Sequence, residues 1–308
     1  MACPEYELKI CKSVVTVVFM SNFANKKTYV EMIRLFLDKL KLSLQKRSAV
    51  TKNKKTYEAW AAKGYNNSPL VSFVIQSHDK SLQVMHAVRK LRDRRDAEIV
   101  VIDDGSSLEH TRRLAEGLTG ANEFLVRAND LYENITYDRC LRFVNGRYVA
   151  LMQDDDDFAS LEWTDEALRL FAEHPDMVIL GGKDGQTVVF DDKERRAHGG
   201  PVYHAGGVAF VPVVNRAPMW IDRQLYDRCL HHIDYSFAPF QYDDFELCLR
   251  AWTVGLKVGW YDAGFTSLSV GGMRLWNNAF TQTQWERNSR TLYNLYRDKI
   301  EEILAKVK

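Results

Sequence analysis

The stretch Tyr148-Val-Ala-Leu-Met-Gln-Asp-Asp-Asp-Asp157 joins a short apolar run to four consecutive aspartates. The apolar run has the length and composition of a buried β-strand. Neighbouring carboxylates about 4 Å apart repel by roughly 1 kcal/mol in water and about 4 kcal/mol at a protein-like dielectric. A divalent cation such as Mg²⁺ or Mn²⁺, which prefers oxygen ligands, would remove this repulsion. The stretch therefore predicts a strand that carries a cation site to a sheet edge; a solvated acidic turn is the alternative.

Three further apolar runs precede this strand, and segments with helical periodicity separate them. These predicted strands are Val71–Ile75, Glu98–Ile102 and Glu123–Arg127. Repeated strand–helix units with apolar strands are typical of a mainly parallel sheet covered by helices on both faces. The predicted fold class is therefore α/β, with a Rossmann-like sheet flanked by helices.

Polar clusters follow three of the predicted strands at their carboxyl ends. They are Gln76–Asp79, Asp103–Ser107 and Asp154–Asp157. In open sheets of this kind, ligands bind beyond the carboxyl ends of the strands. We expect the three clusters to meet in one active site.

The second half of the chain is less regular. We expect a strand at Met177–Leu180, a hairpin around the turn Asp191–Lys193, a loop over residues 194–207 and a closing helix over residues 287–306. Another predicted helix, Asp244–Val254, begins beside Asp243. A helix N-terminus favours acids through its dipole, and this is the structural explanation of that acidic pair.

The first 68 residues form a predicted N-terminal α/β extension. It contains a strand at Ser13–Met20, a helix at Tyr29–Leu44 with apolar residues at helical spacing, and a basic solvated linker at Gln45–Lys55. A basic amphipathic helix can lie on an anionic membrane. Docking on the chain's own domain is the favoured interpretation, and peripheral membrane contact is the alternative.

Composition sets broad limits on location and partners. A net charge of +1 over 308 residues gives no electrostatic argument for nucleic acid. Five cysteines without metal-ligand spacing indicate reduced thiols. The N-terminus lacks a secretion signal, and the longest uncharged apolar run, Val14–Met20, is too short to span a bilayer. We therefore expect a soluble cytoplasmic protein.

Four motifs in a fixed order resemble the family-2 glycosyltransferases, which have the GT-A fold. They are Pro69–Ile75, Val100-Val-Ile-Asp-Asp-Gly-Ser106, the segment Asn145–Asp157 and Tyr242-Asp-Asp-Phe-Glu-Leu-Cys-Leu-Arg250. The resemblance covers about residues 57–296 and implies a GT-A domain over residues 69–296. Residues 69–160 would be its nucleotide-binding half and residues 161–296 its acceptor-binding half. Residues 297–308 would be the end of the C-terminal helix.

The resemblance implies a Mn²⁺ or Mg²⁺ ion held by Asp154, Asp155 and Asp156. Two registers stay open, because the family's first aspartate falls on Gln153: either Asp155 acts with Gln153, or Asp154 and Asp156 are the pair. The family often has a histidine after the last core strand, near Ser269, and this sequence has none there. The residues expected to contact the nucleotide sugar are Gln76, Ser77, His78, Asp79, Asp103, Asp104, Arg127, Asp154 and Asp155.

The acceptor side would supply the catalytic base. The resemblance assigns this role to Asp244, with Asp243 beside it, in an inverting transfer from a nucleotide-diphosphate sugar, preferably a UDP-sugar, to a hydroxyl of a glycan or glycoconjugate. Trp220 lies within Asn215–Arg250, which resembles the family's acceptor-side segment, and is the expected acceptor contact. The alternatives are an inactive sugar-nucleotide or glycan-binding protein of the same fold and, disfavoured by the lack of a glycine-rich basic loop, a nucleotidyltransferase.

Overall fold

The computed structural model describes residues 26–202, 206–268 and 278–307. The chain forms two compact units, residues 1–62 and residues 63–308. The predicted strand Ser13–Met20 lies outside the described residues. None of the described helices is long and apolar enough to cross a bilayer.

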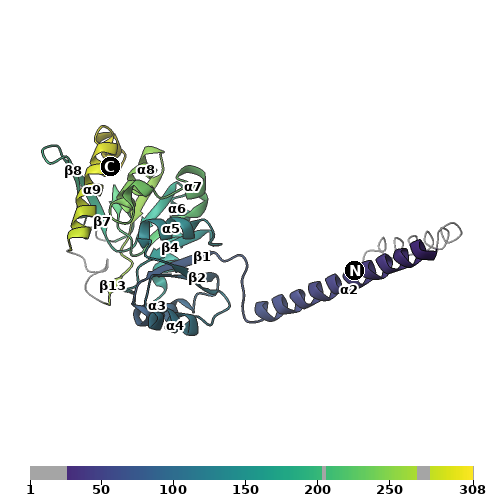
Figure 1. Ribbon diagram of the computed structural model, residues 1–308. Helices are drawn as coiled ribbons and strands as arrows, with labels where there is room; N and C mark the ends of the chain where they lie inside the picture. The colour runs from purple at the N-terminus through teal and green to yellow at the C-terminus, as the bar shows by residue number, and fades with distance from the viewer. Residues whose placement is uncertain (1–25, 203–205, 269–277, 308) are drawn as a thin grey trace. The chain divides into compact units, whose positions relative to one another are not determined.

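The described part of the first unit is one long helix, α2 (Lys26–Ala61), drawn in purple and blue in Figure 1. The predicted linker at Gln45–Lys55 was wrong, because the helix continues through it. This stretch contains no glycine or proline, and its four lysines, together with Gln45, Arg47 and Ala49, favour helix. Thr51 and Thr56 donate their hydroxyls to carbonyls four residues earlier, at 2.9 and 3.0 Å.

The second unit is built on an eight-stranded, mostly parallel sheet. The first four strands in spatial order are parallel, and β11 is antiparallel to both of its neighbours. In sheet order the strands are β3 (Glu123–Ala128), β2 (Ala97–Asp104), β1 (Val71–Ser77), β4 (Tyr148–Met152), β11 (Met219–Asp222), β6 (Met177–Gly181), β12 (Lys257–Trp260) and β9 (Ala209–Phe210).

Helices cover both faces of this sheet (Figure 1). On β1, Phe73 and Ile75 point into one core, whereas Val74 points into the other. One core is covered by α3 (Ser81–Leu91), α4 (Leu108–Gly117) and α6 (Glu162–Glu173). The other is covered by α5 (Tyr132–Leu141), α7 (Arg223–Cys229), α8 (Asp243–Thr253), α9 (Ala279–Tyr296) and α10 (Ile300–Val307). The predicted α/β fold is confirmed.

Two smaller sheets complete the unit. One has the order β10 (Val213–Val214), β7 (Gly185–Asp191), β8 (Arg196–Val202), and the other pairs β13 (Thr266–Ser267) with β5 (Asp156–Asp157). The prediction of a loop over residues 194–207 was therefore wrong for residues 196–202, which form β8. Its Pro201 is tolerated because β8 is an edge strand.

The closing helix predicted over residues 287–306 is also divided in the structure. Helix α9 ends at Tyr296 and α10 starts at Ile300, with a turn in which the Lys299 amide donates to the Tyr296 carbonyl at 2.9 Å. This turn lets Ile300 and Ile303 pack into the core.

Candidate active site

Hydrogen bonds join the three predicted polar clusters at the carboxyl ends of β1, β2 and β4. The Gln76 side-chain amide donates to Asp104 at 3.1 Å, and the His78 ring contacts the Asp104 carbonyl at 2.7 Å. The backbone amide of His78 donates to the Asp154 carboxylate at 3.0 Å. The clusters therefore form one edge site, as the parallel strands predict.

Asp103 and Asp104 are both fully buried but have different surroundings. The Asp104 carboxylate accepts the backbone amides of Leu131 and Tyr132, each at 2.8 Å. In Asp103, Oδ2 accepts the Thr111 hydroxyl at 2.7 Å, whereas Oδ1 has no hydrogen-bond partner among the described residues. A buried acceptor without a partner is costly, so Asp103 is the better candidate to bind a ligand.

The remaining residues expected on the donor side lie around this pair. The Asp79 backbone has φ +54°, its amide donates to the Ser106 hydroxyl at 2.9 Å, and its carboxylate accepts the Ser107 amide at 2.8 Å. That bond lowers the pKa of Asp79. Arg127 is half-exposed, with its Nε 3.9 Å from Asp103. Ser77 has a buried hydroxyl without a hydrogen-bond partner among the described residues. Through its bonds to Ser106 and Ser107, Asp79 fixes the backbone of the loop after β2.

Both carboxylate oxygens of Asp154 already bind other groups of the protein. One carboxylate oxygen accepts the His78 amide, and the other accepts Lys80 Nζ at 3.0 Å. Lys80 Nζ also lies 4.0 Å from the carboxylate of Asp155, which is 6% exposed. Asp155 is therefore the more available of the two for a cation.

Asp156 combines burial with an unmet hydrogen-bond requirement. Its Oδ2 accepts the Gln153 amide at 2.8 Å, but its buried Oδ1 has no partner among the described residues. Burial raises the pKa of Asp156 to about 7, and the neighbouring Asp155 adds to the increase. Asp157 points elsewhere and binds Lys90 at 2.6 Å. The orphan oxygen of Asp156, next to Asp155, fits a hard cation.

Helix α5 connects the donor edge to the acidic start of α8. Its Tyr132 amide binds Asp104, and the Asn134 side chain donates to Asp243 at 3.2 Å. One turn on, the Tyr137 hydroxyl donates to the Met152 carbonyl at 2.7 Å, at the end of the strand that leads to the four aspartates. One short helix thus binds both Asp243 at the start of α8 and the end of the strand that leads to the four aspartates.

Asp243 is neutralised by a buried cation. Arg216 and Asp243 form a two-pronged ion pair, and their side chains are 5% and 0% exposed. The guanidinium also stacks over the Tyr137 ring, 5.1 Å from its centroid. Arg216 belongs to none of the four motifs. Only its position within the acceptor-side segment, Asn215–Arg250, could have drawn attention to it.

Asp244 has a freer carboxylate than its neighbour. Its Oδ1 accepts the Phe245 amide at 2.9 Å. Burial raises the pKa of Asp244 to about 6, with Arg216 opposing the increase and Asp243 adding to it. In the same cluster, burial raises the pKa of Glu133 on α5 to about 8. A carboxylate whose pKa lies near 6 is suited to accept a proton at neutral pH. Sequence reasoning missed Glu133, which lies outside all four motifs.

Trp220 occupies the centre of the sheet. It is 0% exposed, lies opposite Ala150 of β4 and Leu180 of β6, and donates its indole N–H to Tyr261 at 3.3 Å. This burial leaves no indole surface for an acceptor. The structure therefore places Trp220 in the core, in contrast to the expected acceptor contact.

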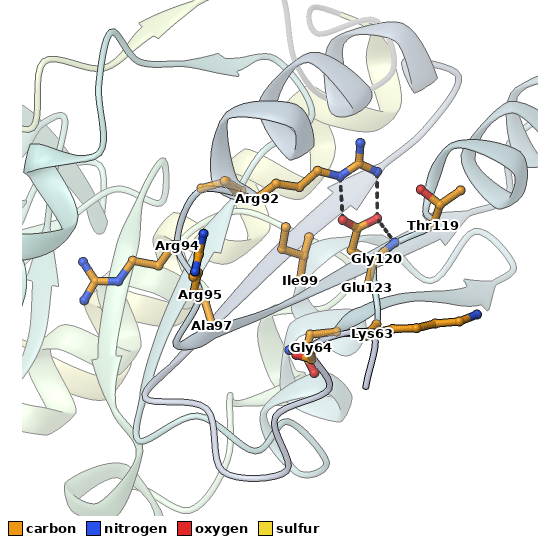
Figure 2. A pocket seen from close by; sticks show the side chains of 13 residues that line it. Lys63, Gly64, Arg92, Arg94, Arg95, Ala97, Ile99, Thr119, Gly120 and Glu123 are labelled. Atoms are coloured by element: carbon orange, nitrogen blue, oxygen red, sulfur yellow. Dashed lines mark hydrogen bonds and ion pairs between the residues drawn. The ribbon is translucent and has the colours of Figure 1, made fainter. Parts of the chain in front are cut away.

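A cavity of about 560 Å³ lies at the opposite edge, near the amino ends of β2 and β3. Figure 2 shows Arg92 facing Glu123, which it binds at 2.6 and 2.8 Å. Arg94 also lines the cavity and forms ion pairs with Asp96 and Asp165. These cations are paired within the protein, and the cavity lies a whole strand length from Asp103, so it is separate from the candidate active site.

Comparison with known proteins decides the family. The sequence model described as glycosyl transferase family 2 matches residues 72–236, more than half of the chain. The chain belongs to glycosyl transferase family 2. This confirms the resemblance seen in the motifs. No curated protein matches the sequence.

The chain is also similar to several solved structures. GalNAc-T7 with UDP, GalNAc and Mn²⁺ matches with a TM-score of 0.53 and 16% identity, over 64% of this chain and 43% of that one. A mannosyltransferase from Pyrobaculum calidifontis with GDP-Man and Mn²⁺ has a TM-score of 0.47, 15% identity and coverages of 71% and 64%. S. aureus TarS 1–349 with UDP-GlcNAc has a TM-score of 0.49, 14% identity and coverages of 68% and 61%. The chain thus spans 43–64% of the length of these proteins. The match to GalNAc-T7, whose TM-score exceeds 0.5, confirms the GT-A fold.

Proposed function

We propose that this protein is a glycosyltransferase that moves a sugar from a nucleotide-diphosphate sugar, preferably a UDP-sugar, to a hydroxyl of a glycan or glycoconjugate. The observation that carries the proposal is the junction made by α5, which binds both Asp243, the neighbour of Asp244, and the end of the strand that leads to the four aspartates. The UDP and Mn²⁺ in the GalNAc-T7 structure support this choice of donor and cation.

The donor set fits a divalent cation, either Mn²⁺ or Mg²⁺. Asp155 and Asp156 would hold it, because Asp156 has a buried oxygen without a partner and both oxygens of Asp154 bind other groups. When bound, such an ion neutralises charge on the diphosphate leaving group. The segment near Ser269, where the family often has a histidine, lies outside the described residues.

The protein's own residues would perform binding and proton transfer. Oδ1 of Asp103 would accept an N–H of the base or a ribose hydroxyl, since an ionised carboxylate only accepts. Asp244 would take the acceptor's hydroxyl proton as the acceptor oxygen bonds to the anomeric carbon. The bond from that carbon to the diphosphate breaks on the opposite face, so the configuration inverts. Asp243, fixed by Arg216, would hold the start of α8 in position.

A donor screen tests the proposal. Thermal shifts would be measured with UDP-, GDP- and dTDP-sugars, with and without Mn²⁺, followed by assays of donor hydrolysis and transfer. We expect a UDP-sugar to raise the melting temperature only when the metal is present. Binding without turnover would instead indicate an inactive sugar-nucleotide-binding protein. If no nucleotide sugar stabilises the protein, the proposal is wrong.

We also propose a cytoplasmic location. The three cysteines among the described residues, Cys140, Cys229 and Cys248, are free thiols. Free thiols are typical of proteins kept in a reducing compartment.

A further inference from the structure

Helix α2 carries an apolar face along its first half. At 3.6 residues per turn, the residues of this face cover about 160° of the circumference between residues 30 and 44, with no charged side chain among them. The apolar face consists of Val30, Met32, Ile33, Phe36, Leu37, Leu40 and Leu44. Five of these seven side chains are exposed. Most of the stability of helices in proteins comes from packing of such a face, so we expect it to have a partner.

The same helix concentrates the positive charge of the chain. It contains ten of the 42 lysines and arginines and three of the 41 acids, a net charge of +7 in a chain whose total is +1. Arg34 and Lys41 border the apolar face on one side, and Lys39 borders it on the other. Long basic side chains in this position can lay their methylenes on an apolar layer while their charges reach anionic groups.

A second copy of the chain suits this helix poorly. The spacing of Val30, Ile33, Leu37, Leu40 and Leu44 follows a heptad pattern, but the next core positions are Arg47, Thr51 and Lys54. Two apolar heptads are fewer than the three or four that a coiled coil requires. Two helices of charge +7 would also repel each other.

We propose that α2 docks this protein on a membrane surface that contains anionic lipids. The helix lies in the plane of the headgroups, with the apolar face toward the acyl chains and the cations among the lipid phosphates and carboxylates. Helices of this type sink about 5–10 Å into the interface, and each basic residue near the surface contributes to binding. The inference does not depend on the donor, the acceptor or the reaction of the catalytic unit.

Vesicle flotation with the full chain tests this proposal. One set of vesicles would contain phosphatidylcholine alone, and a second set would contain about one-third phosphatidylserine. We expect at least about tenfold tighter binding to the anionic vesicles, and a clear loss when NaCl rises from about 0.1 to about 0.5 M. Equal or no binding to the two sets would overturn the proposal.

A matched pair of variants tests the orientation of the helix. Leu37 and Leu44 lie on the apolar face and are 55% and 56% exposed. Leu35 and Leu42 lie on the opposite side and are 61% and 52% exposed. Each pair is seven residues apart, so serine at both positions changes helix propensity and composition equally.

We expect L37S/L44S to lower vesicle affinity at least about tenfold and L35S/L42S to lower it less than about threefold. Circular dichroism would check that both variants keep the same helix content. Equal losses in the two variants would show that the apolar face is not the lipid contact. A wild-type dimer in sedimentation experiments that L37S/L44S converts to monomer would assign the face to a second copy instead.

Discussion

Arg216 and Asp243 form a buried ion pair directly beside Asp244 at the start of α8. The pair gives two adjacent aspartates different roles. Asp243 is neutralised by Arg216 and hydrogen-bonded by Asn134, whereas Asp244 keeps a carboxylate that Arg216 only partly stabilises. The helix-dipole explanation treats both acids alike, so it does not account for this difference.

Asn substitutions at the two positions should separate catalysis from stability. In D244N the base is lost, and we expect turnover to fall by about 10²–10⁴-fold with donor binding retained. In D243N the Arg216 charge is left buried and unpaired, and we expect the free energy of unfolding to fall by about 3–5 kcal/mol. Turnover assays and denaturant unfolding of both variants measure these effects. Near-normal turnover in D244N would remove Asp244 from the mechanism.

The pH dependence of transfer should report Asp244. A general base acts in its deprotonated form, and burial raises the pKa of Asp244 to about 6. We therefore expect kcat/KM to be level above this pKa and to fall about tenfold per pH unit below it. A profile measured with saturating metal tests this. If kcat/KM instead begins to fall only near pH 4, the base is a carboxylate that lacks the buried environment of Asp244.

The stability of the protein should fall with rising pH in part because of Asp156. Its folded-state pKa is about 7 against an ordinary value of 3.8, so the native state binds the proton more tightly than the unfolded state. This contribution is complete below about pH 4 and is lost as the pH rises toward 7. We expect D156N to be more stable than the wild type at pH 8, by at most about 4 kcal/mol.

Mn²⁺ provides the control for this prediction. If Asp156 holds the metal, Mn²⁺ should stabilise the wild type more at pH 8 than at pH 5.5, and should stabilise D156N much less. Thermal melts at both pH values measure these differences. The same Mn²⁺ response in D156N and the wild type would exclude Asp156 as a ligand.

The sequence predicted the sheet and its edge site because those features depend on local patterns. Apolar runs ending in polar residues located β1, β2 and β4, and parallel strands then bring residues such as Gln76 and Asp104 together. It could not separate Asp103 from Asp104, because that difference comes from backbone amides at the start of α5, more than 20 residues away. Arg216 was missed for the same reason, since its partner, Asp243, is 27 residues along the chain.

Trp220 shows a different limit of sequence reasoning. Its neighbours in the sequence pointed to the acceptor segment, but its place between β4 and β6 is set by strand order. An aromatic residue at a central strand position serves the core whichever motif lies nearby. In α2, the basic stretch after residue 44 looked like a linker because its apolar pattern ends, although its residues favour helix.

Replacing Trp220 by Phe should test its assignment to the core. The ring would still fill most of the space between Phe73 and Trp163, but the hydrogen bond to Tyr261 would be lost. We expect a loss of stability of about 1–2 kcal/mol with an unchanged KM for the acceptor. A large increase in that KM at constant stability would return Trp220 to the acceptor site.

Asn substitutions at Asp103 and Asp104 should separate nucleotide binding from folding. Asp103 has a free buried oxygen, so D103N should weaken nucleotide binding by about tenfold or more, because an amide can turn its N–H₂ toward the ligand. Asp104 accepts two backbone amides, so D104N should mainly lower the melting temperature. Calorimetric titration with UDP and thermal melts of both variants measure the two effects. If D104N weakens UDP binding as much as D103N while both remain folded, the two carboxylates share the nucleotide, and the contrast in their hydrogen bonds has no functional meaning.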